Sequence, residues 1–501
     1  MNLAWTIYIS FIGVAVLMML PRGNARAART IALLSASAGL LCALAGLFSA
    51  KPGSEIQTIS RTSWIPSMGI EYHLASDGIS LTLVLLTGLA AVAGILFSWN
   101  IEHRAKEFFA FYLALIGGVY GVFLSFDLFL LFVFYELAII PKYFIIAIWG
   151  STNREYGAMK LALYSFVGSA MVLVGLIAAY VVSGAKTMSL IELAKYPFPE
   201  TFQHWAFPLV FIGFAILAGI WPFHTWAPTG HVAAPTAASM LLAGVVMKLG
   251  AYGCLRVAMT LFPLGLKAWH SHIAILAVIG IVYAATVALV QKDFKFVIGY
   301  SSVSHMGFVL LGLMTLHEIG ITGAVMQMFS HGIIAGLLFA VVGRMVYERA
   351  HTRELALLQQ MNLQKAIPFA AVTFTIAGMA SMGMPGFSGF VAELQILIGA
   401  WHAFPTFAVI AGVGVLIGVA FTLRALQMAF FGEHDGEAIP ATAATNGHTH
   451  MEPITVPERL GAAMLIGVSL LIGLYPRLLL DLIVPSLNST LFEGLRNAKC
   501  L

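Results

Sequence analysis

The sequence predicts an all-α polytopic membrane protein, and its composition and its long apolar runs are the observations that predict it. Of the 501 residues, 60% are hydrophobic and only 10% are charged, whereas a soluble domain carries roughly 25% charged residues. So few charges cannot cover a solvated surface, and most of the outer face is therefore expected to meet lipid.

A bilayer core is crossed by a helix of roughly 20 apolar residues. By this measure the chain contains about fourteen transmembrane helices. They lie near residues 3–20, 30–49, 79–98, 108–125, 128–149, 158–183, 205–221, 233–257, 272–290, 296–315, 321–346, 368–400, 404–430 and 459–476. The first run has no basic segment before it and no small-residue cleavage site, so we interpret it as a membrane helix and not as a signal peptide. The connections are short, which predicts a single transmembrane domain over residues 1–501.

Composition also excludes several classes of function. Basic residues exceed acidic ones by only four, 26 against 22, which is too small a surplus to indicate a nucleic-acid partner. The cysteines Cys42, Cys254 and Cys500 lie far apart, without the spacing of a metal site or of a disulfide framework. We therefore expect no metal and no cofactor-binding residues in this chain.

Lysines and arginines predict the orientation, because they favour cytoplasmic loops. Two basic loops follow the first and eleventh runs and hold Arg22, Arg26, Arg29, Arg344, Arg349, Arg353 and Lys365. If the helices alternate in direction, both loops lie on one side, which holds about fourteen basic residues against about nine opposite. Both termini are then expected on the non-cytoplasmic side.

Two of the apolar runs are interrupted by glycine and proline. The seventh contains Gly219 and Pro222, and the twelfth carries GMPGFSG at 383–389. Proline breaks a helix, and freed backbone groups at membrane depth persist only where protein or water satisfies them. Two interrupted helices five spans apart are typical of transporters with an internal inverted repeat. For either break alone, the alternative is a packing kink.

Ionisable side chains inside apolar runs are the candidate functional residues, because burying them in a membrane is costly. Those at mid-span positions are Glu136, Lys142, Lys248, Glu393 and Arg424. Burial disfavours the charged form of a carboxylate or an amine, so such groups change protonation near neutral pH, as a proton relay requires. The alternative is a set of structural ion pairs between helices.

Histidines are further candidates, since histidine titrates near physiological pH and can pass protons. His224 and His231 lie near the seventh-span break, while His305 and His331 lie inside later runs. For any one of them, a satisfied core histidine is an equally good interpretation. Lys295 lies close to a helix start and is expected at the membrane interface.

Several longer motifs resemble the family of M subunits of respiratory complex I, the NADH:quinone oxidoreductase. They are WIPSMGIEYHLASDGISL (64–81), FVFYELAIIPKYFIIAIWG (132–150), HTWAP, APTAASMLLAGVVMKLGAYG, KFVIGYSSVSHMGFVL (295–310), FSHGIIAGLLF and GMPGFSGFVAEL. The resemblance implies fourteen helices with two inverted five-helix repeats. It would divide the chain into N-terminal helices (1–107), a first repeat (108–257), a second repeat (272–430) and a C-terminal helix and tail (459–501).

The resemblance also implies a function. Such a subunit translocates protons across the bacterial inner membrane when quinone is reduced elsewhere in the complex. It has no redox centre of its own, because nicotinamide, flavin, iron–sulfur clusters and quinone belong to other subunits. Its implied partners are the L-type and N-type antiporter-like subunits and the lipid bilayer.

Site residues follow from the resemblance position by position. Glu136 matches the fifth-helix glutamate of the family, Lys248 its central eighth-helix lysine and Glu393 its twelfth-helix acid. Where the family has a lysine in the seventh helix, this chain has Leu217, and Lys142 stands where the family usually has an apolar residue. This implies a divergent paralogue whose first half-channel is altered.

Three functions remain open from the sequence. The first is a proton-translocating complex I subunit, the second a subunit of a multisubunit cation/proton antiporter, and the third a spacer that no longer pumps. For a relay, Glu136, Lys248 and Glu393 should lie at similar depth and line a polar path. Lys142 is six residues beyond Glu136, and a direct ion pair between them is not expected.

Overall fold

The computed structural model describes residues 3–21, 23–49, 53, 55–432 and 451–498. Within these residues, 12 helices are long and apolar enough to cross a membrane, or up to 13 if one bent pair near the C-terminus is a single span. Two of the expected spans fall outside this set. One is the first, whose helix has only 15 residues, and the other is the interrupted twelfth run. The prediction of a multi-pass helical membrane protein is confirmed.

The N-terminal part consists of two helices, a hairpin and a buried third helix. Its elements are α1 (Trp5–Met19), α2 (Ala25–Ser49), β1 (Gln57–Ile65), η1 (Pro66–Met68), β2 (Ile70–Ser76) and α3 (Gly78–Phe97). Strands β1 and β2 pair antiparallel. The sequence predicted only helices and no strand between the runs 30–49 and 79–98, so this hairpin is an unpredicted element.

The next part runs from the fourth to the eighth predicted span. Its elements are α4 (Ala105–Leu124), α5 (Leu128–Trp149), α6 (Arg154–Ser183), α7 (Leu190–Leu193), α8 (Glu200–Ala218), α9 (Trp226–Ala233), α10 (Thr236–Leu241), η2 (Leu242–Val246), α11 (Met247–Gly253), η3 (Cys254–Ala258) and α12 (Met259–Leu261). Elements α10 to α12 form one continuous span that is buried inside the bundle. The turns η2 and η3 within it are π-helical.

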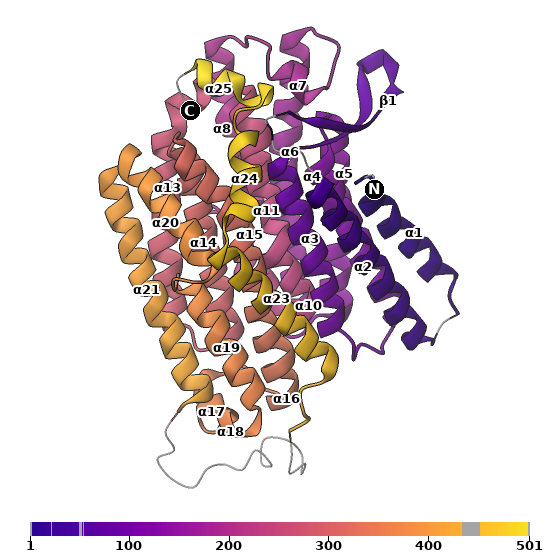
Figure 1. The fold of residues 1–501 in the computed structure, drawn as a ribbon, viewed down its shortest axis with the longest axis vertical. Helices are drawn as coiled ribbons and strands as arrows, with labels where there is room; N and C mark the ends of the chain where they lie inside the picture. The colour runs from indigo at the N-terminus through magenta and orange to yellow at the C-terminus, as the bar shows by residue number, and fades with distance from the viewer. Residues whose placement is uncertain (1–2, 22, 50–52, 54, 433–450, 499–501) are drawn as a thin grey trace.

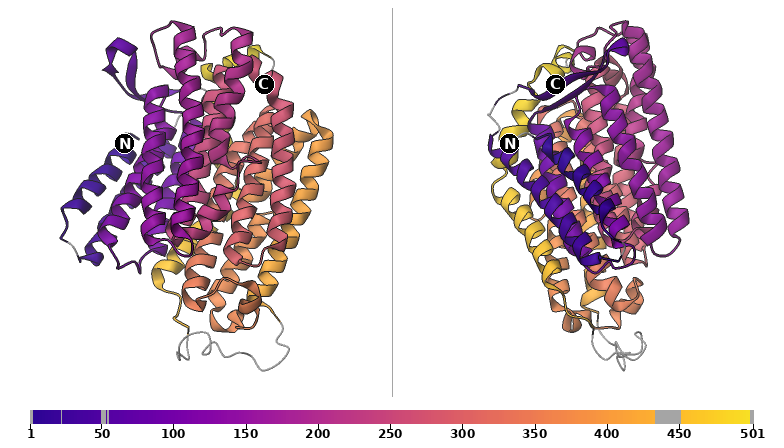
Figure 2. Two further views of the ribbon diagram at one scale, coloured as in Figure 1. Left: turned by 180° about the vertical axis from the view of Figure 1, so that it is seen from behind. Right: turned by 90° about the vertical axis from the view of Figure 1, so that its right-hand side faces the viewer.

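The remaining elements complete the bundle. They are α13 (Pro263–Val290), α14 (Phe294–Met314), α15 (Glu318–Ala340), the π-helical η4 (Val341–Tyr347), α16 (Glu348–Ala350), α17 (Leu355–Gln359), α18 (Leu363–Ala366), α19 (Pro368–Ser381), α20 (Ser388–Ala403), α21 (Pro405–Phe430), α23 (Val456–Leu474), α24 (Arg477–Ser486), η5 (Thr490–Phe492) and α25 (Glu493–Asn497). Helices α1 and α2 lie on one flank of the bundle and α21 on the other (Figures 1 and 2).

Both predicted interruptions are confirmed. Helix α8 ends at Ala218, and the chain turns at Gly219 with a φ of 90° before α9 begins at Trp226. Helix α19 ends at Ser381, and α20 begins at Ser388. Glycine adopts positive φ at these turns without a steric cost, and proline ends a helix. These two residue types therefore predicted where the helices are interrupted.

The bundle has two distinct ends. The hairpin, α7 and α25 lie at one end, called here the hairpin end, and α16 to α18 lie at the other, called the α17 end (Figure 1). Near the hairpin end, Arg256 and Asp77 form a fully buried ion pair with an N–O distance of 2.5 Å. Asp77 also caps α3 by accepting the backbone N–H of Ser80, so this pair ties the start of α3 to η3.

Candidate functional site

Lys248 lies in the middle of the buried span formed by α10, η2 and α11. Its side chain is fully buried. The amine donates a hydrogen bond of 2.5 Å to the carbonyl of Ala243, which lies in the π-helical turn η2, and it lies 2.6 Å from Nδ1 of His331. π-helical turns are frequent at functional sites, because they alter the backbone hydrogen-bond ladder. The amine is thus held by protein groups and does not reach lipid.

A second contact extends this pair across α14 and α20. The ring centroids of His331 and His305 lie 5.4 Å apart. Nδ1 of His305 lies 3.1 Å from Oε1 of Glu393, and the amide of Gln327 donates to the same oxygen at 3.2 Å. Lys248, His331, His305 and Glu393 therefore form a continuous series, called here the Lys248–Glu393 row.

The break between α19 and α20 has a direct role at the end of this row. A side-chain Cβ placed on Gly383 would lie only 2.8 Å from Oε2 of Glu393. The residue at that position also has a φ of 72°, which glycine adopts without strain. The broken segment therefore lets the backbone approach the carboxylate closely.

Hydroxyl groups surround the same break, and sequence reasoning missed them. Ser381 lies 3.2 Å from Nε2 of His305, and Ser388 contacts both Ser330 and Ser469, at 2.8 and 3.2 Å. A hydroxyl can both donate and accept, so it suits a path along which protons move. The only signal available was that two of these serines flank the glycine-rich break.

Glu136 stands apart from the row in the described structure. It is half-buried in α5, and its Oε1 has no hydrogen-bond partner among the described residues. Lys142 is almost completely buried, and its amine likewise has no partner there. The ion pairs among the described residues do not include these two groups, in agreement with the expectation that no direct pair forms. Leu217 is buried in α8, with its backbone close to Gly250.

The other predicted candidates have different surroundings. His224 is 2% exposed beside the ring of Tyr283, at 5.4 Å between centroids. Arg424 donates to the carbonyls of Leu289 and Gln291 at 2.8 and 3.1 Å. A cation at these last carbonyls of α13 stabilises the helix end, so the contacts of Arg424 are those of a structural residue.

Lys295 and His231 lie together near the α17 end. Lys295 is the second residue of α14, as its position near a helix start predicted, but its side chain is only 2% exposed. Its amine donates to the carbonyl of Ala234 at 2.7 Å. His231 is fully buried, and neither ring nitrogen has a partner among the described residues.

Sequence comparison relates this chain to a known family. The sequence profile described as NADH:quinone oxidoreductase/Mrp antiporter, TM, matches residues 125–418. NADH-quinone oxidoreductase subunit M of Rhodobacter capsulatus is 37% identical, over 96% of this chain and 94% of that protein. NAD(P)H-quinone oxidoreductase chain 4 1 of Synechococcus sp. (strain JA-2-3B'a(2-13)) is 37% identical, over 84% of this chain and 80% of that protein.

Solved structures agree with this relationship. A chain of respiratory complex I from Thermus thermophilus superimposes with a TM-score of 0.88 and 27% identity, covering 100% of this chain and 99% of that chain. A chain of the Mrp complex from Dietzia sp. DQ12-45-1b gives a TM-score of 0.84 at 22% identity, over 100% of this chain and 99% of that chain, a likeness of fold alone.

The fold and the matches define an antiporter-like, multi-pass membrane subunit. The chain belongs to the NADH:quinone oxidoreductase/Mrp antiporter transmembrane family and is an M-type membrane subunit of NADH:quinone oxidoreductase, complex I.

Proposed function

We propose that this subunit translocates protons across the membrane when other subunits of the complex reduce quinone. The observation that carries the proposal is the Lys248–Glu393 row, in which four titratable side chains follow one another through the bundle. Buried ionisable groups in membrane proteins mark ion and proton pathways. Nicotinamide, flavin, iron–sulfur clusters and quinone would be held by other subunits, and L-type and N-type subunits would be the neighbours in the membrane.

Each member of the row has a specific part in this function. Lys248 holds a proton at Nζ and passes it to Nδ1 of His331, 2.6 Å away. The proton then crosses to His305 and reaches the carboxylate of Glu393, whose Oε1 lies 3.1 Å from Nδ1 of His305. The apolar side chains packed around the row exclude bulk water, so that protons leave only along the row.

The orientation is also part of the proposal. The arginine-rich segment from Arg344 to Arg353 lies at the α17 end. Arg29 lies on the same side, because it donates to the carbonyl of Ile101, next to Asn100, which contacts Glu348. Since cytoplasmic segments are enriched in lysine and arginine, we assign the α17 end to the cytoplasm. Both termini and the hairpin then face the other side.

The test is Lys248→Met in the whole complex reconstituted into vesicles. Methionine retains the bulk of the side chain and removes the proton site, so assembly should be retained. Proton translocation should fall by about tenfold or more, and quinone reduction should fall with it because the two are coupled. Lys186→Met, at an exposed loop position, is the matched control and should leave both activities unchanged.

A second candidate function is a spacer subunit that no longer pumps, in a paralogue that has lost part of its first half-channel. Two observations favour it. Leu217 occupies the position at which the resemblance to the family implies a lysine, and Glu136 has no cation within ion-pair distance among the described residues. An unchanged number of protons per electron in assembled Lys248→Met complexes would support the spacer and contradict the proton-translocating function.

A further inference from the structure

We propose that a cavity at the α17 end is the place where protons enter this subunit, and that Lys295 and His231 carry them from the cavity to Lys248. The inference rests on the proposed function and specifies how the row is loaded. The route starts outside the row and reaches it without passing through Glu136.

The cavity has a volume of about 200 Å³ and lies where five segments of the chain meet. Its polar lining comes from Ser98, Asn100, Ser151, Thr236, Lys295 and Glu348. Asn100 is exposed, whereas Lys295 and Thr236 are buried, so the cavity leads from the surface to the buried amine. Since one water needs on the order of 10–15 Å³ of such space, several waters fit beside Lys295.

The amine of Lys295 is poised at the inner wall of this cavity. An ammonium group has three N–H donors, and the described residues supply one hydrogen-bond acceptor, the carbonyl of Ala234. The remaining donors therefore require water, which the adjoining cavity provides. Arg353, Asp293 and Glu348 are the charged groups that act on Lys295.

His231 provides the next step. It precedes Ala234 by three residues, and both of its ring nitrogens are buried without a protein partner. Buried polar atoms in proteins are almost always satisfied, so these nitrogens require bound water. Lys295 and Lys248 both act electrostatically on His231, so its ring lies within electrostatic range of both amines.

The backbone between His231 and Lys248 continues the polar line. The hydroxyl of Ser239 donates to the carbonyl of His231 at 2.7 Å. Ala243 lies one helical turn beyond Ser239, and its carbonyl accepts the amine of Lys248. Lys248 thus reaches back along its helix toward the α17 end.

The proton moves along this route in two transfers. In the first, an N–H bond breaks at Lys295 and a new N–H bond forms at one ring nitrogen of His231. In the second, the other ring nitrogen of His231 releases a proton to Lys248.

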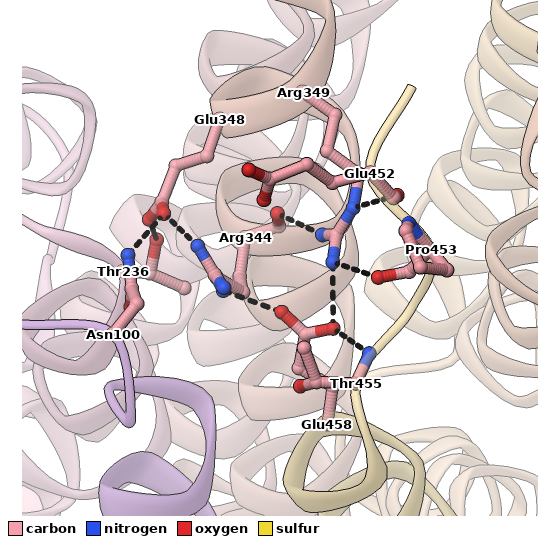
Figure 3. Close-up of polar contacts among 9 residues, drawn as sticks. All are labelled: Asn100, Thr236, Arg344, Glu348, Arg349, Glu452, Pro453, Thr455 and Glu458. Carbon is pink, nitrogen blue, oxygen red and sulfur yellow. Dashed lines mark hydrogen bonds and ion pairs between the residues drawn. The ribbon is translucent and has the colours of Figure 1, made fainter. Parts of the chain in front are cut away.

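Glu348 is fixed at the cavity wall by a rigid set of charges. Figure 3 shows its carboxylate between Asn100, Thr236 and Arg344, and Asn100 donates to it at 2.8 Å. Arg344 is itself paired with Glu458. The carboxylate is therefore held in one place, where it offers a fixed acceptor to protonated water entering the cavity.

The first experiment compares Lys295→Met with Lys292→Met in the reconstituted complex. Lys292 is exposed at the same helix start and serves as the control. We expect Lys295→Met to lower coupled quinone reduction and proton translocation by about tenfold, with Lys292→Met unchanged. His231→Phe keeps a planar ring without nitrogens and should give a similar loss. Full activity in assembled Lys295→Met and His231→Phe complexes would overturn the inference.

The second experiment probes the cavity directly. In Ser151→Cys, a negatively charged, membrane-impermeant thiol reagent added to the cytoplasmic face should label the introduced cysteine and slow turnover by filling the cavity. Thr152→Cys is exposed beside the cavity and should be labelled without loss of activity. The absence of labelling at residue 151, or labelling without slowing, would contradict the inference.

The two proposals fail in different ways. If Lys248→Met stops translocation while the Lys295, His231 and Ser151 variants behave as wild type, the entry route is wrong and the proposed function stands. If Lys248→Met translocates normally, the proposed function itself is wrong.

Discussion

Glu458 and Arg349 are 109 residues apart in the sequence, yet their side chains meet at 2.8 Å and are 1% and 2% exposed. Arg344 pairs with the same carboxylate, so that one acid balances two guanidinium groups (Figure 3). Glu458 also accepts the backbone N–H of Thr455 in a capping box at the start of α23. This contact fastens α23 to η4 and α16.

We expect Glu458→Gln to destabilise the subunit strongly. Removing one partner of a buried ion pair costs about 3–5 kcal/mol, because an uncompensated charge stays buried. The midpoint of thermal unfolding of the detergent-solubilised complex should fall. On heating, this subunit should dissociate from the complex before the other subunits do. Glu452→Gln is the control, because the side chain of Glu452 is exposed and only its backbone carbonyl accepts Arg349. Equal stability of the two variants would contradict this role.

Glu393→Gln should reduce proton translocation without affecting folding or assembly. The amide keeps the shape of the carboxylate but cannot take up the proton passed from His305, whose Nδ1 lies 3.1 Å from it. We expect translocation in vesicles to fall by about tenfold or more, with normal assembly. Glu318→Gln, at an exposed helix start, should behave as wild type. A Glu393→Gln complex that pumps at the normal rate would remove this residue from the row.

Leu217→Lys tests whether the bundle around Glu136 lacks a cation that translocation needs. A lysine introduced here would supply a cation in the part of the bundle where Glu136 has none within ion-pair distance. If proton translocation through that part of the bundle is reduced but not abolished, the number of protons translocated per electron pair should rise in the variant, or its pH dependence should shift. Leu217→Met controls for the change of shape. The same stoichiometry and pH profile in both variants would mean that the missing charge does not limit this subunit.

A pH effect on stability is expected from Asp127, the N-cap residue before α5. Burial raises the pKa of this carboxyl from 3.8 to about 6, although the backbone N–H groups of Leu130, Glu71 and Phe129 donate to it and act in the opposite direction. Its stabilising contribution is therefore fully present below pH 3.8 and is lost as the pH rises to about 6.

Asp127→Asn removes this titration. The wild-type protein should lose thermal stability relative to the variant as the pH is raised from about 4 to about 6, with no further divergence above that range. The measurement is the unfolding midpoint of both proteins across this range. Parallel curves would show that the carboxyl does not titrate there.

Much of the bundle could be predicted because hydropathy and helix breakers act locally. The interruptions at Gly219 and at 383–389 follow from residues that fit turns of positive φ. Lys248 and Glu393 were visible as charges within apolar runs. Their buried locations agree with that expectation.

Other features depend on contacts between distant segments and were not predictable in this way. Hydropathy does not distinguish an α-helical from a π-helical turn, so η2 was missed. The hairpin depends on backbone pairing between two polar segments. Lys248 meets His331 across 83 residues, and this contact is set by how η2, the turn just before Lys248, packs against α15.

The two nitrogens of His305 have different neighbours, Glu393 at Nδ1 and Ser381 at Nε2. A proton that enters the ring at one nitrogen and leaves from the other exchanges the tautomer of the imidazole. The ring then presents an acceptor where the next transfer needs a donor, until it rotates or the protons shift back. Under the proposed function, each passage would be followed by this reset of the ring, and the row would deliver protons one at a time.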